Sequence, residues 1–236
     1  GDNVDLGGNW VNYGGTTTLN NLDLGTGGKL TVGQGKISVN GLLQAGEADG
    51  QITIDGAGQF WANGYSETNA LGIDVNGGRF ANTGAVTGTI QLTASGGQTL
   101  LGVDGARFDI NTDSDLTVTG SNTKIGFDGI ANGIATLGMN DGSGLTFNAD
   151  AEGFSTVREF RSGYFDQAAP AVRSGVALDG TLEIDLTAYT GVATSFTLVN
   201  VDALSGAFDS VLVIGLAANQ NAIVTIDYAN DEVRLE

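Results

Sequence analysis

Short runs in which apolar and polar residues alternate occur along most of the chain. Examples are the runs at 30–32, 52–54 and 73–75, which read Leu-Thr-Val, Ile-Thr-Ile and Ile-Asp-Val. Alternation with a period of two over three to five residues is typical of a strand that buries one of its faces. Glycine, asparagine and aspartate separate the runs, and these residue types favour tight turns. The pattern therefore predicts an all-β chain.

The runs also recur at a roughly constant interval. Ile52 and Ile73 are 21 positions apart and Ile90 follows after 17, whereas Phe80 and Phe108 are 28 apart. A repeat of about 20 residues that contains two or three short strands is typical of a coil in a parallel β-helix. We therefore expect a right-handed parallel β-helix (a β-solenoid). Its inward-facing residues are expected to be Leu30, Val32, Ile52, Ile54, Phe60, Ile73, Val75, Phe80, Ile90, Leu92, Phe108 and Ile110.

An antiparallel β-sandwich or jelly roll is the alternative fold, because it also contains many short strands at regular spacing. Hairpins in such folds favour two-residue Asn-Gly or Asp-Gly turns directly between paired strands. Most corners in this chain are longer than that. The repeated element, a glycine followed by an apolar-x-apolar run, also reads in one direction, which favours stacked parallel coils.

The pattern divides the chain into two parts. Residues 1–152 are predicted to form β-helix coils with an N-terminal cap strand, and residues 153–236 a short helix and loop followed by a C-terminal β-rich cap. Phe154, Val157, Phe160 and Arg161 have helical spacing, and Ser155 is placed as an N-cap. Pro170, the single proline, falls in the loop that follows. From Val176 onward the runs become longer and more apolar, as expected of a segment that covers the open edge of the last coil.

Composition removes several kinds of chemistry. The chain has 236 residues, including 39 glycines and one proline, and it has no cysteine and no histidine. A zinc site built on those residues, haem ligation, thiol catalysis and a Ser-His-Asp triad are therefore excluded. With 27 acidic and 9 basic side chains the net charge is −18, which repels nucleic acid. No apolar run reaches the length of a transmembrane segment, so we expect neither a nucleic-acid partner nor a membrane span.

Calcium is the one cofactor that the sequence suggests, because carboxylate and carbonyl oxygens on turns can bind it. The turns at 111–115 and 140–143 gather such oxygens, and Asp113, Asp115 and Asp141 are the candidate ligands of a structural Ca²⁺ ion. Neither turn matches the twelve-residue calcium loop or the nonapeptide calcium repeat. Ordinary turn formation by Asx residues is the alternative interpretation.

Catalytic candidates are weak, and we expect the chain not to be an enzyme. Carboxylates are abundant, but no pair is distinguished by its position. Arg79 and Arg107 could serve a polysaccharide lyase as basic groups, with an exposed or ion-paired surface charge as the alternative interpretation.

Two further binding surfaces can be considered from the sequence. Trp10, Tyr13, Trp61 and Tyr65 could form a carbohydrate-stacking patch, although large aromatic residues more often pack in a core or cap. Threonines do not recur at one coil position in the sequence pattern, which disfavours an ice-binding face and favours simple β-propensity.

Residues 27–150, together with the apolar runs at 182–186, 196–200, 204–208 and 224–228, resemble bacterial secreted β-helix proteins, including autotransporter passenger domains and related surface adhesins. The resemblance implies a structural or adhesive role at an extracellular or cell-surface location, with no catalytic residues to carry over. A carbohydrate-active enzyme of the polysaccharide-lyase type is the alternative, and a phage or virion structural protein is the second alternative.

Self-association is the remaining expectation. The apolar run from Val4 to Val11, and a β-helix end without a polar cap, offer backbone groups to another copy of the chain. Head-to-tail contacts that do not close produce a filament. We therefore expect a homo-oligomer or polymer, such as a filament or layer subunit, with a glycan as a second candidate partner.

Overall fold

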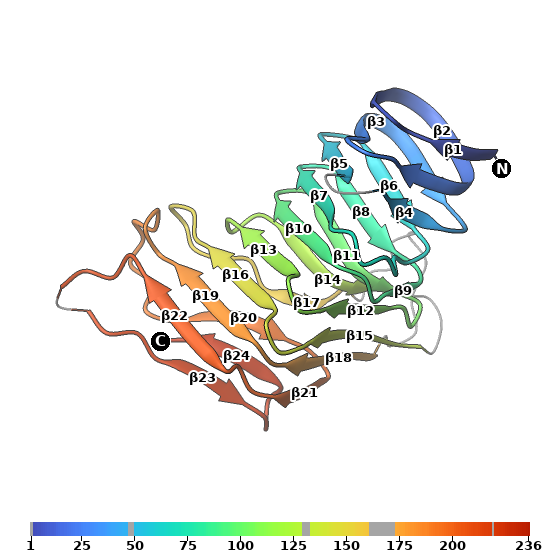
Figure 1. Ribbon diagram of the computed structural model, residues 1–236. Coiled ribbons are helices and arrows are strands. Elements are labelled where there is room, and N and C mark those ends of the chain that lie inside the picture. The colour runs from blue at the N-terminus through green and yellow to red at the C-terminus, as the bar shows by residue number, and fades with distance from the viewer. Residues whose placement is uncertain (1, 47–49, 129–132, 161–172, 219) are drawn as a thin grey trace.

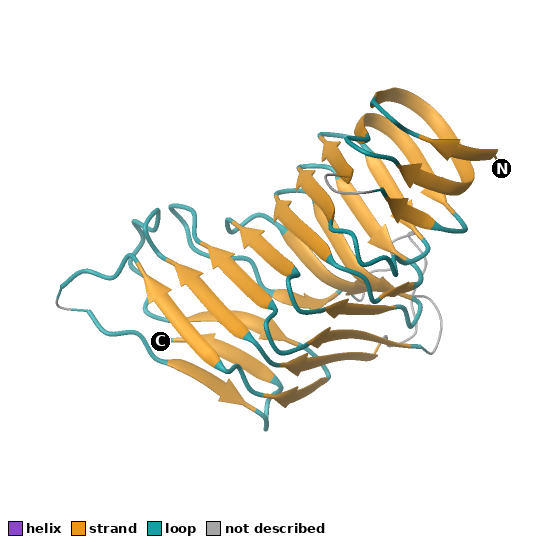
Figure 2. Cartoon of the chain, in the orientation of Figure 1, coloured by secondary structure: helices purple, strands orange, loops and turns teal. Residues whose placement is uncertain are grey.

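The computed structural model describes the chain except for residues 1, 47–49, 129–132, 161–172 and 219. The described residues form strands joined by turns and loops, without any helix (Figure 2). The prediction of an all-β chain is therefore confirmed. Within these residues no helix exists that has the length and apolar character needed to cross a membrane.

The strands follow one another in an elongated stack, with the two chain ends at opposite ends of it (Figure 1). We call its three sides the first, second and third face. The first face is a parallel ladder that begins with the N-terminal parts of two long strands, β2 (Asn9–Leu24) and β3 (Lys29–Val39). It continues through β5 (Gly50–Asp55), β7 (Leu71–Asn76), β10 (Ile90–Ser95), β13 (Asp115–Thr119), β16 (Gly144–Asn148), β19 (Thr181–Asp185) and β22 (Ser210–Ile214).

The second face is formed by the later parts of β2 and β3 and by the strands that follow each first-face strand. These are β6 (Gln59–Ala62), β8 (Arg79–Asn82), β11 (Gln98–Val103), β14 (Lys124–Asp128), β17 (Val157–Glu159) and β20 (Phe196–Asn200), all paired in parallel. The last strand, β24 (Glu232–Leu235), pairs antiparallel with both β20 and β23 (Val224–Asp227).

The third face starts with β1 (Asp2–Asp5) and β4 (Leu43–Ala45), which both pair in parallel with the end of β2. A separate parallel ladder follows. It consists of β9 (Ala85–Val86), β12 (Arg107–Ile110), β15 (Ile134–Met139), β18 (Arg173–Leu178) and β21 (Ala203–Gly206).

The registers give the length of each coil. Successive partners on the first face are Asn9, Lys29, Gln51, Gly72, Gln91, Asp115, Gly144, Thr181 and Ser210. The first four steps span 19 to 22 residues and the last four span 24 to 37. The stacked parallel ladders are consistent with a β-solenoid-like fold and do not fit the antiparallel sandwich.

The interior is a set of apolar ladders, because one residue of each strand lies directly against its counterpart in the next coil. Leu30, Ile52 and Ile73 are successive partners, and all are buried. Phe60 stacks on Phe80 with ring centroids 6.5 Å apart. All twelve residues predicted to face inward are buried. Burying such a side chain contributes about 1.5–3 kcal/mol, so the repeated ladders are the main source of stability.

The short helix predicted near residue 154 is wrong over the described residues. Val157–Glu159 is strand β17, in which Val157 is buried and Arg158 is exposed, as period-two alternation requires. Ser155 is not an N-cap: its hydroxyl donates to Gly120 O (2.6 Å) and accepts from the N–H of Thr123 (2.9 Å). It therefore links two coils. Arg161 and Pro170 lie outside the described residues.

The parallel ladders continue across residue 153, where the cap was predicted to start. β19 and β22 extend the first face, β17 and β20 the second, and β18 and β21 the third. Among the described residues, antiparallel strand pairing is restricted to the C-terminal β20–β24 and β23–β24 contacts. These two contacts close the stack on the second face.

Candidate functional site

Three basic side chains lie in one outward-facing column on the second face. Lys36, Gln59, Arg79, Gln98 and Lys124 are successive register partners, one from each of five neighbouring strands. The residue after each of them is buried, so all five side chains point outward. Neighbouring strands are about 4.8 Å apart, which places successive cations about 10 Å apart with an amide between them.

A hollow of about 470 Å³ lies at the corner where the first face turns into the second. Arg79, Lys124 and the amides of Gln59, Gln98 and Asn122 line it, together with Gly56, Ala57, Gly77 and Gly97. The three glycines have left-handed backbone conformations, with φ of 54°, 79° and 64°. Because glycine occupies these three corner positions, a ligand can approach the polar groups along the length of several coils.

A second hollow of about 290 Å³ continues the first toward the C-terminal end. The two share Asn122 and Lys124, and the second adds Arg158 and the half-buried ring of Phe154. We call the two hollows together the cationic groove. None of the described residues that line it is acidic. In a chain of net charge −18 this composition is the clearest departure from the average surface.

Asp150 fixes the wall of the groove from behind. Its Oδ2 accepts hydrogen bonds from the N–H and the hydroxyl of Ser121 (2.7 and 2.8 Å), and its Oδ1 accepts from the N–H groups of Glu152 and Gly153 (2.9 and 3.0 Å). The hydrogen bond from the Ser121 backbone is the main reason that the pKa of Asp150 is lowered to about 2. The ionised carboxylate thereby holds the turn that presents Asn122.

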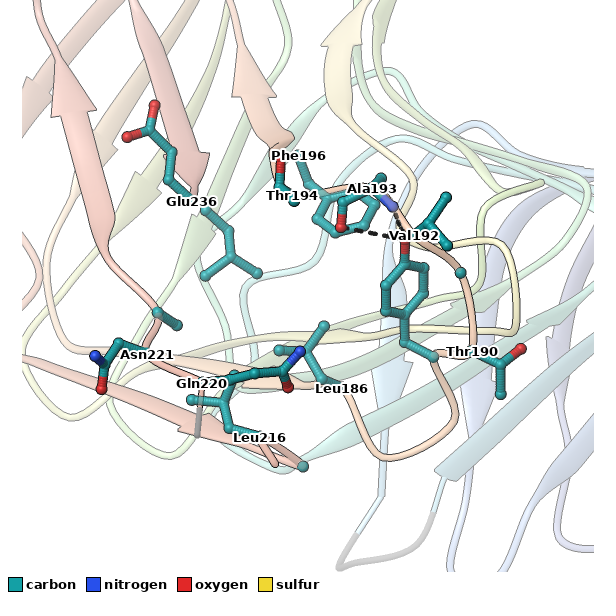
Figure 3. Close-up of a pocket in the computed structure, with 15 residues that line it drawn as sticks. Leu186, Thr190, Val192, Ala193, Thr194, Phe196, Leu216, Gln220, Asn221 and Glu236 are labelled. Carbon is teal, nitrogen blue, oxygen red and sulfur yellow. Dashed lines mark hydrogen bonds between the residues drawn. The ribbon is translucent and has the colours of Figure 1, made fainter. Parts of the chain in front are cut away.

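A third hollow, of about 560 Å³, lies farther along the same corner, near the C-terminal end of the stack (Figure 3). Its lining is more apolar and includes Leu186, Phe196 and Leu216. Tyr189 packs edge-on against Phe196, with ring centroids 5.2 Å apart, and its hydroxyl accepts the N–H of Ala193 (2.6 Å). This hollow carries no basic side chain among its described residues and is chemically distinct from the cationic groove.

The predicted calcium ligands lie in stacked turns at a different corner, where the third face turns into the first. Asp113 precedes β13, Asp115 is its first residue, and Asp141 precedes β16. The contacts between the turns use backbone and amide oxygens: the Thr112 hydroxyl donates to Asp141 O (2.8 Å), and Asn140 Nδ2 donates to Asn111 Oδ1 (2.5 Å). The described part of the chain contains no group of three or more carboxylates arranged to hold a metal. Calcium binding at these residues stays a prediction.

The two arginines considered for catalysis lie on different faces. Arg79 lines the cationic groove on the second face. Arg107 lies on the third face, where its Nε is 2.6 Å from a carboxylate oxygen of Asp109. That ion pair raises the pKa of Arg107, chiefly through the hydrogen bond to Asp109. The two side chains therefore do not form one site.

One carboxyl pair is distinguished by its surroundings, although the sequence did not single it out. Burial raises the pKa of Glu159, and interaction with Asp202 raises it further, while a hydrogen bond from the Ser174 hydroxyl to Glu159 Oε1 (2.6 Å) acts in the opposite direction. The pair lies where the second face turns into the third, away from the corner that carries the cationic groove. Its carboxyls are therefore not positioned against the cations.

The four aromatic residues proposed as a carbohydrate-stacking patch do not lie together. Tyr65 is buried and its hydroxyl donates to Asn69 O, which places it in the core. The Trp61 ring lies under Lys36, whose Nζ is 3.8 Å from the ring centroid. Trp10 and Tyr13 are on β2 at the N-terminal end. A single patch is therefore wrong, because core packing and a cation–π contact occupy two of the four rings.

A column of threonines does exist on the first face, contrary to the expectation from the sequence. Coil lengths that vary by several residues hide this register in the sequence. Two carboxylates interrupt the column, so we assign it no ligand. Its successive members are Thr31, Thr53, Asp74, Thr93, Thr117, Thr146 and Glu183.

Comparison of the chain with protein-family models, with curated proteins and with solved structures finds no match. The function is therefore inferred from the geometry of the cationic groove.

Proposed function

We propose that the chain is a right-handed parallel β-helix that acts outside the cell or at its surface, as a structural or adhesive protein that binds an acidic polysaccharide. The cationic groove supports this proposal. Three cations and three amides line the groove, and none of its described lining residues is acidic, although the whole chain carries a net charge of −18. An acidic glycan offers carboxylates or sulfates to the cations and hydroxyls to the amides.

The chemistry of the lining residues fits such a ligand. The guanidinium groups of Arg79 and Arg158 can each donate two parallel hydrogen bonds to a carboxylate or sulfate. The amides of Gln59, Gln98 and Asn122 can both donate to and accept from sugar hydroxyls. A single exposed ion pair contributes only about 0–1 kcal/mol. Useful affinity therefore requires a polymer that contacts several coils at once.

Charge density favours a polysaccharide over a nucleic acid. Duplex DNA carries one charge per about 1.7 Å of its axis, which a protein of net charge −18 repels strongly. Cations about 10 Å apart with amides between them instead suit a polymer that carries one charge per sugar, with neutral hydroxyls between the charges.

Binding of polygalacturonate at low ionic strength, followed by isothermal titration calorimetry, tests the proposal. The double variant Arg79→Gln, Lys124→Gln should bind at least about tenfold more weakly than the unsubstituted chain. Lys29→Gln is the matched control, because Lys29 is an exposed strand-start cation on the first face. It should leave the affinity unchanged.

Three results would contradict the proposal. One is equal loss of affinity in the Lys29→Gln control, which would indicate non-specific attraction. The second is tighter binding to single-stranded DNA than to polygalacturonate. The third is absence of binding to any acidic polysaccharide. If unsaturated uronate products accumulate in the same mixture, the polysaccharide-lyase alternative replaces the adhesive role.

A further inference from the structure

At the C-terminal end of the stack, the outer edge of β22 is open. β22 pairs with β19 on its inner side, and no described strand pairs with its outer side. Its side chains include exposed apolar groups: Val211 is 46% exposed, Leu212 48% and Ile214 36%. An open, apolar edge strand is a template for pairing with another strand.

The chain covers the other two faces at this end. On the second face, β24 pairs antiparallel with β20. On the third face, residues next to the β23–β24 turn satisfy the edge of β21: Asp231 accepts the Leu204 N–H (2.8 Å), and the Tyr228 hydroxyl donates to Gly206 O (2.5 Å). On the first face the edge of β22 stays open, beside the loop that leads from β22 to β23 (Figure 1), and on the second face the outer side of β23 also has no described partner strand.

The N-terminal end of the stack is open on the same face. β1 pairs with Leu19–Asp23 of β2, so the preceding segment, from Asn9 to Thr18, has no described strand on its outer side. This segment also exposes apolar side chains, since Val11 is 43% exposed and Tyr13 73%.

We propose that the open edge of β22 pairs in parallel with the first part of β2 in a second copy of the chain. All strands of the first face run in the same direction, so this pairing continues the first-face ladder without reversal. Continuation of the register places Val211 against Trp10 and Leu212 against Val11. Apolar groups thereby meet apolar groups at both positions.

The contact is heterologous, because it joins two different edges of the molecule. Each copy that is added presents a new open β22 edge, so the association does not close and leads to a filament. The cationic groove lies at the corner between the first and second faces, over coils in the middle of the stack, and it remains accessible in such a filament.

Cysteine cross-linking tests the pairing directly, because the chain has no cysteine of its own. Val11→Cys and Leu212→Cys are prepared as separate proteins, mixed and mildly oxidised. Neighbouring strands about 4.8 Å apart satisfy the Cα separation that a disulfide needs. We expect a covalent heterodimer in at least about tenfold excess over either homodimer. A chain that carries both substitutions should give a ladder of covalent oligomers.

The matched control is Thr117→Cys, which lies in the same outward column of the first face but in the middle of the stack. Its mixture with Val11→Cys should give no cross-link above background.

A dominant Leu212→Cys homodimer would overturn the proposal in favour of edge-to-edge pairing of two β22 strands. It is also overturned if the mixture does not cross-link and the unsubstituted chain sediments as a monomer at high salt. A uniformly folded Leu212→Asp variant that still polymerises would overturn it as well.

Discussion

At the scale of single residues, the carboxylate that matters most for the groove lies in a corner and not on a strand. Asp150 accepts hydrogen bonds from two parts of the chain, Ser121 on one side and the N–H groups of Glu152 and Gly153 on the other. Only an acceptor with two oxygens satisfies both sets of donors. The turn that presents Asn122 to a ligand is therefore held in place by a single ionised group.

Asp150→Asn should lower the stability of the chain at pH 6 by about 1 kcal/mol, because the amide loses the charge and turns an NH₂ group toward one set of N–H donors. The folded pKa of Asp150 is about 2, below the ordinary value of 3.8. The stabilisation is thus fully present above pH 3.8 and is lost as the pH falls through about 2. Thermal melting, followed by circular dichroism at pH 6 and near pH 2, measures the difference in stability between the unsubstituted chain and the Asp150→Asn variant. The control Asp141→Asn should not change the melting temperature at pH 6, and a pH-independent effect of Asp150→Asn would contradict the assignment.

At the scale of elements, the corners between the first and second faces require glycine where adjacent coils touch. Gly97 has a φ of 64°, and a Cβ atom placed on it would be 2.1 Å from Gly78 O and 2.5 Å from Gly77 C. These are backbone atoms, which cannot rotate away. The smooth floor of the cationic groove is therefore a consequence of how closely the coils stack.

Gly97→Ala should lower the free energy of unfolding by about 2 kcal/mol or more, since it combines a strained backbone conformation with a steric clash. Gly14→Ala is the matched control, because an added Cβ at that position meets no atom within 4 Å. Its effect should stay within about 0.5 kcal/mol. Urea unfolding at equilibrium gives both values, and equal effects of the two substitutions would show that close stacking at Gly97 is not what matters.

The strands and their inward-facing residues could be predicted from the sequence far better than which residues of neighbouring strands are paired. Period-two alternation identifies the inward residues locally, and all twelve predicted ones are buried. Register requires the length of every corner, which the sequence pattern does not give. Phe80 lies against Thr99 and not against Phe108, which is paired with Leu137 on the third face. β17 escaped recognition because three residues are too few to distinguish an alternating pattern from a helical one.

The cationic groove could not be predicted from the sequence for the same reason. Its column members Lys36, Gln59, Arg79, Gln98 and Lys124 are separated by 23, 20, 19 and 26 positions. Such uneven spacing conceals the column until the coils are stacked. The sequence singles out Arg79 only as a basic group that could serve a lyase, together with Arg107, which lies on another face.

At the scale of the whole molecule, the charge of −18 acts on the two proposed interactions in opposite directions. The cationic groove attracts a polyanion, and salt weakens that attraction by screening it. Stacking of two copies brings like charges together, including Asp2 and Asp5 at one end and Asp209 and Glu236 at the other. Salt screens this repulsion and leaves the apolar contact of β22 with β2 in place. The two interactions can therefore be separated by ionic strength alone.

Between about 0.05 M and about 0.5 M salt, over which the screening length falls from roughly 14 Å to roughly 4 Å, polygalacturonate affinity should fall while the weight-average mass should rise. Calorimetry measures the first quantity and sedimentation velocity the second, on the same preparation. The double variant Arg79→Gln, Lys124→Gln should lose the salt response of the affinity and keep that of the mass. The Leu212→Asp variant should keep the response of the affinity and lose that of the mass. If affinity and mass both fall, or both rise, as salt is added, salt does not act on the two contacts in opposite directions. The assignment of stacking to the first-face edges is then wrong. Each variant is expected to lose one response and keep the other because the groove and the open edges share no residue.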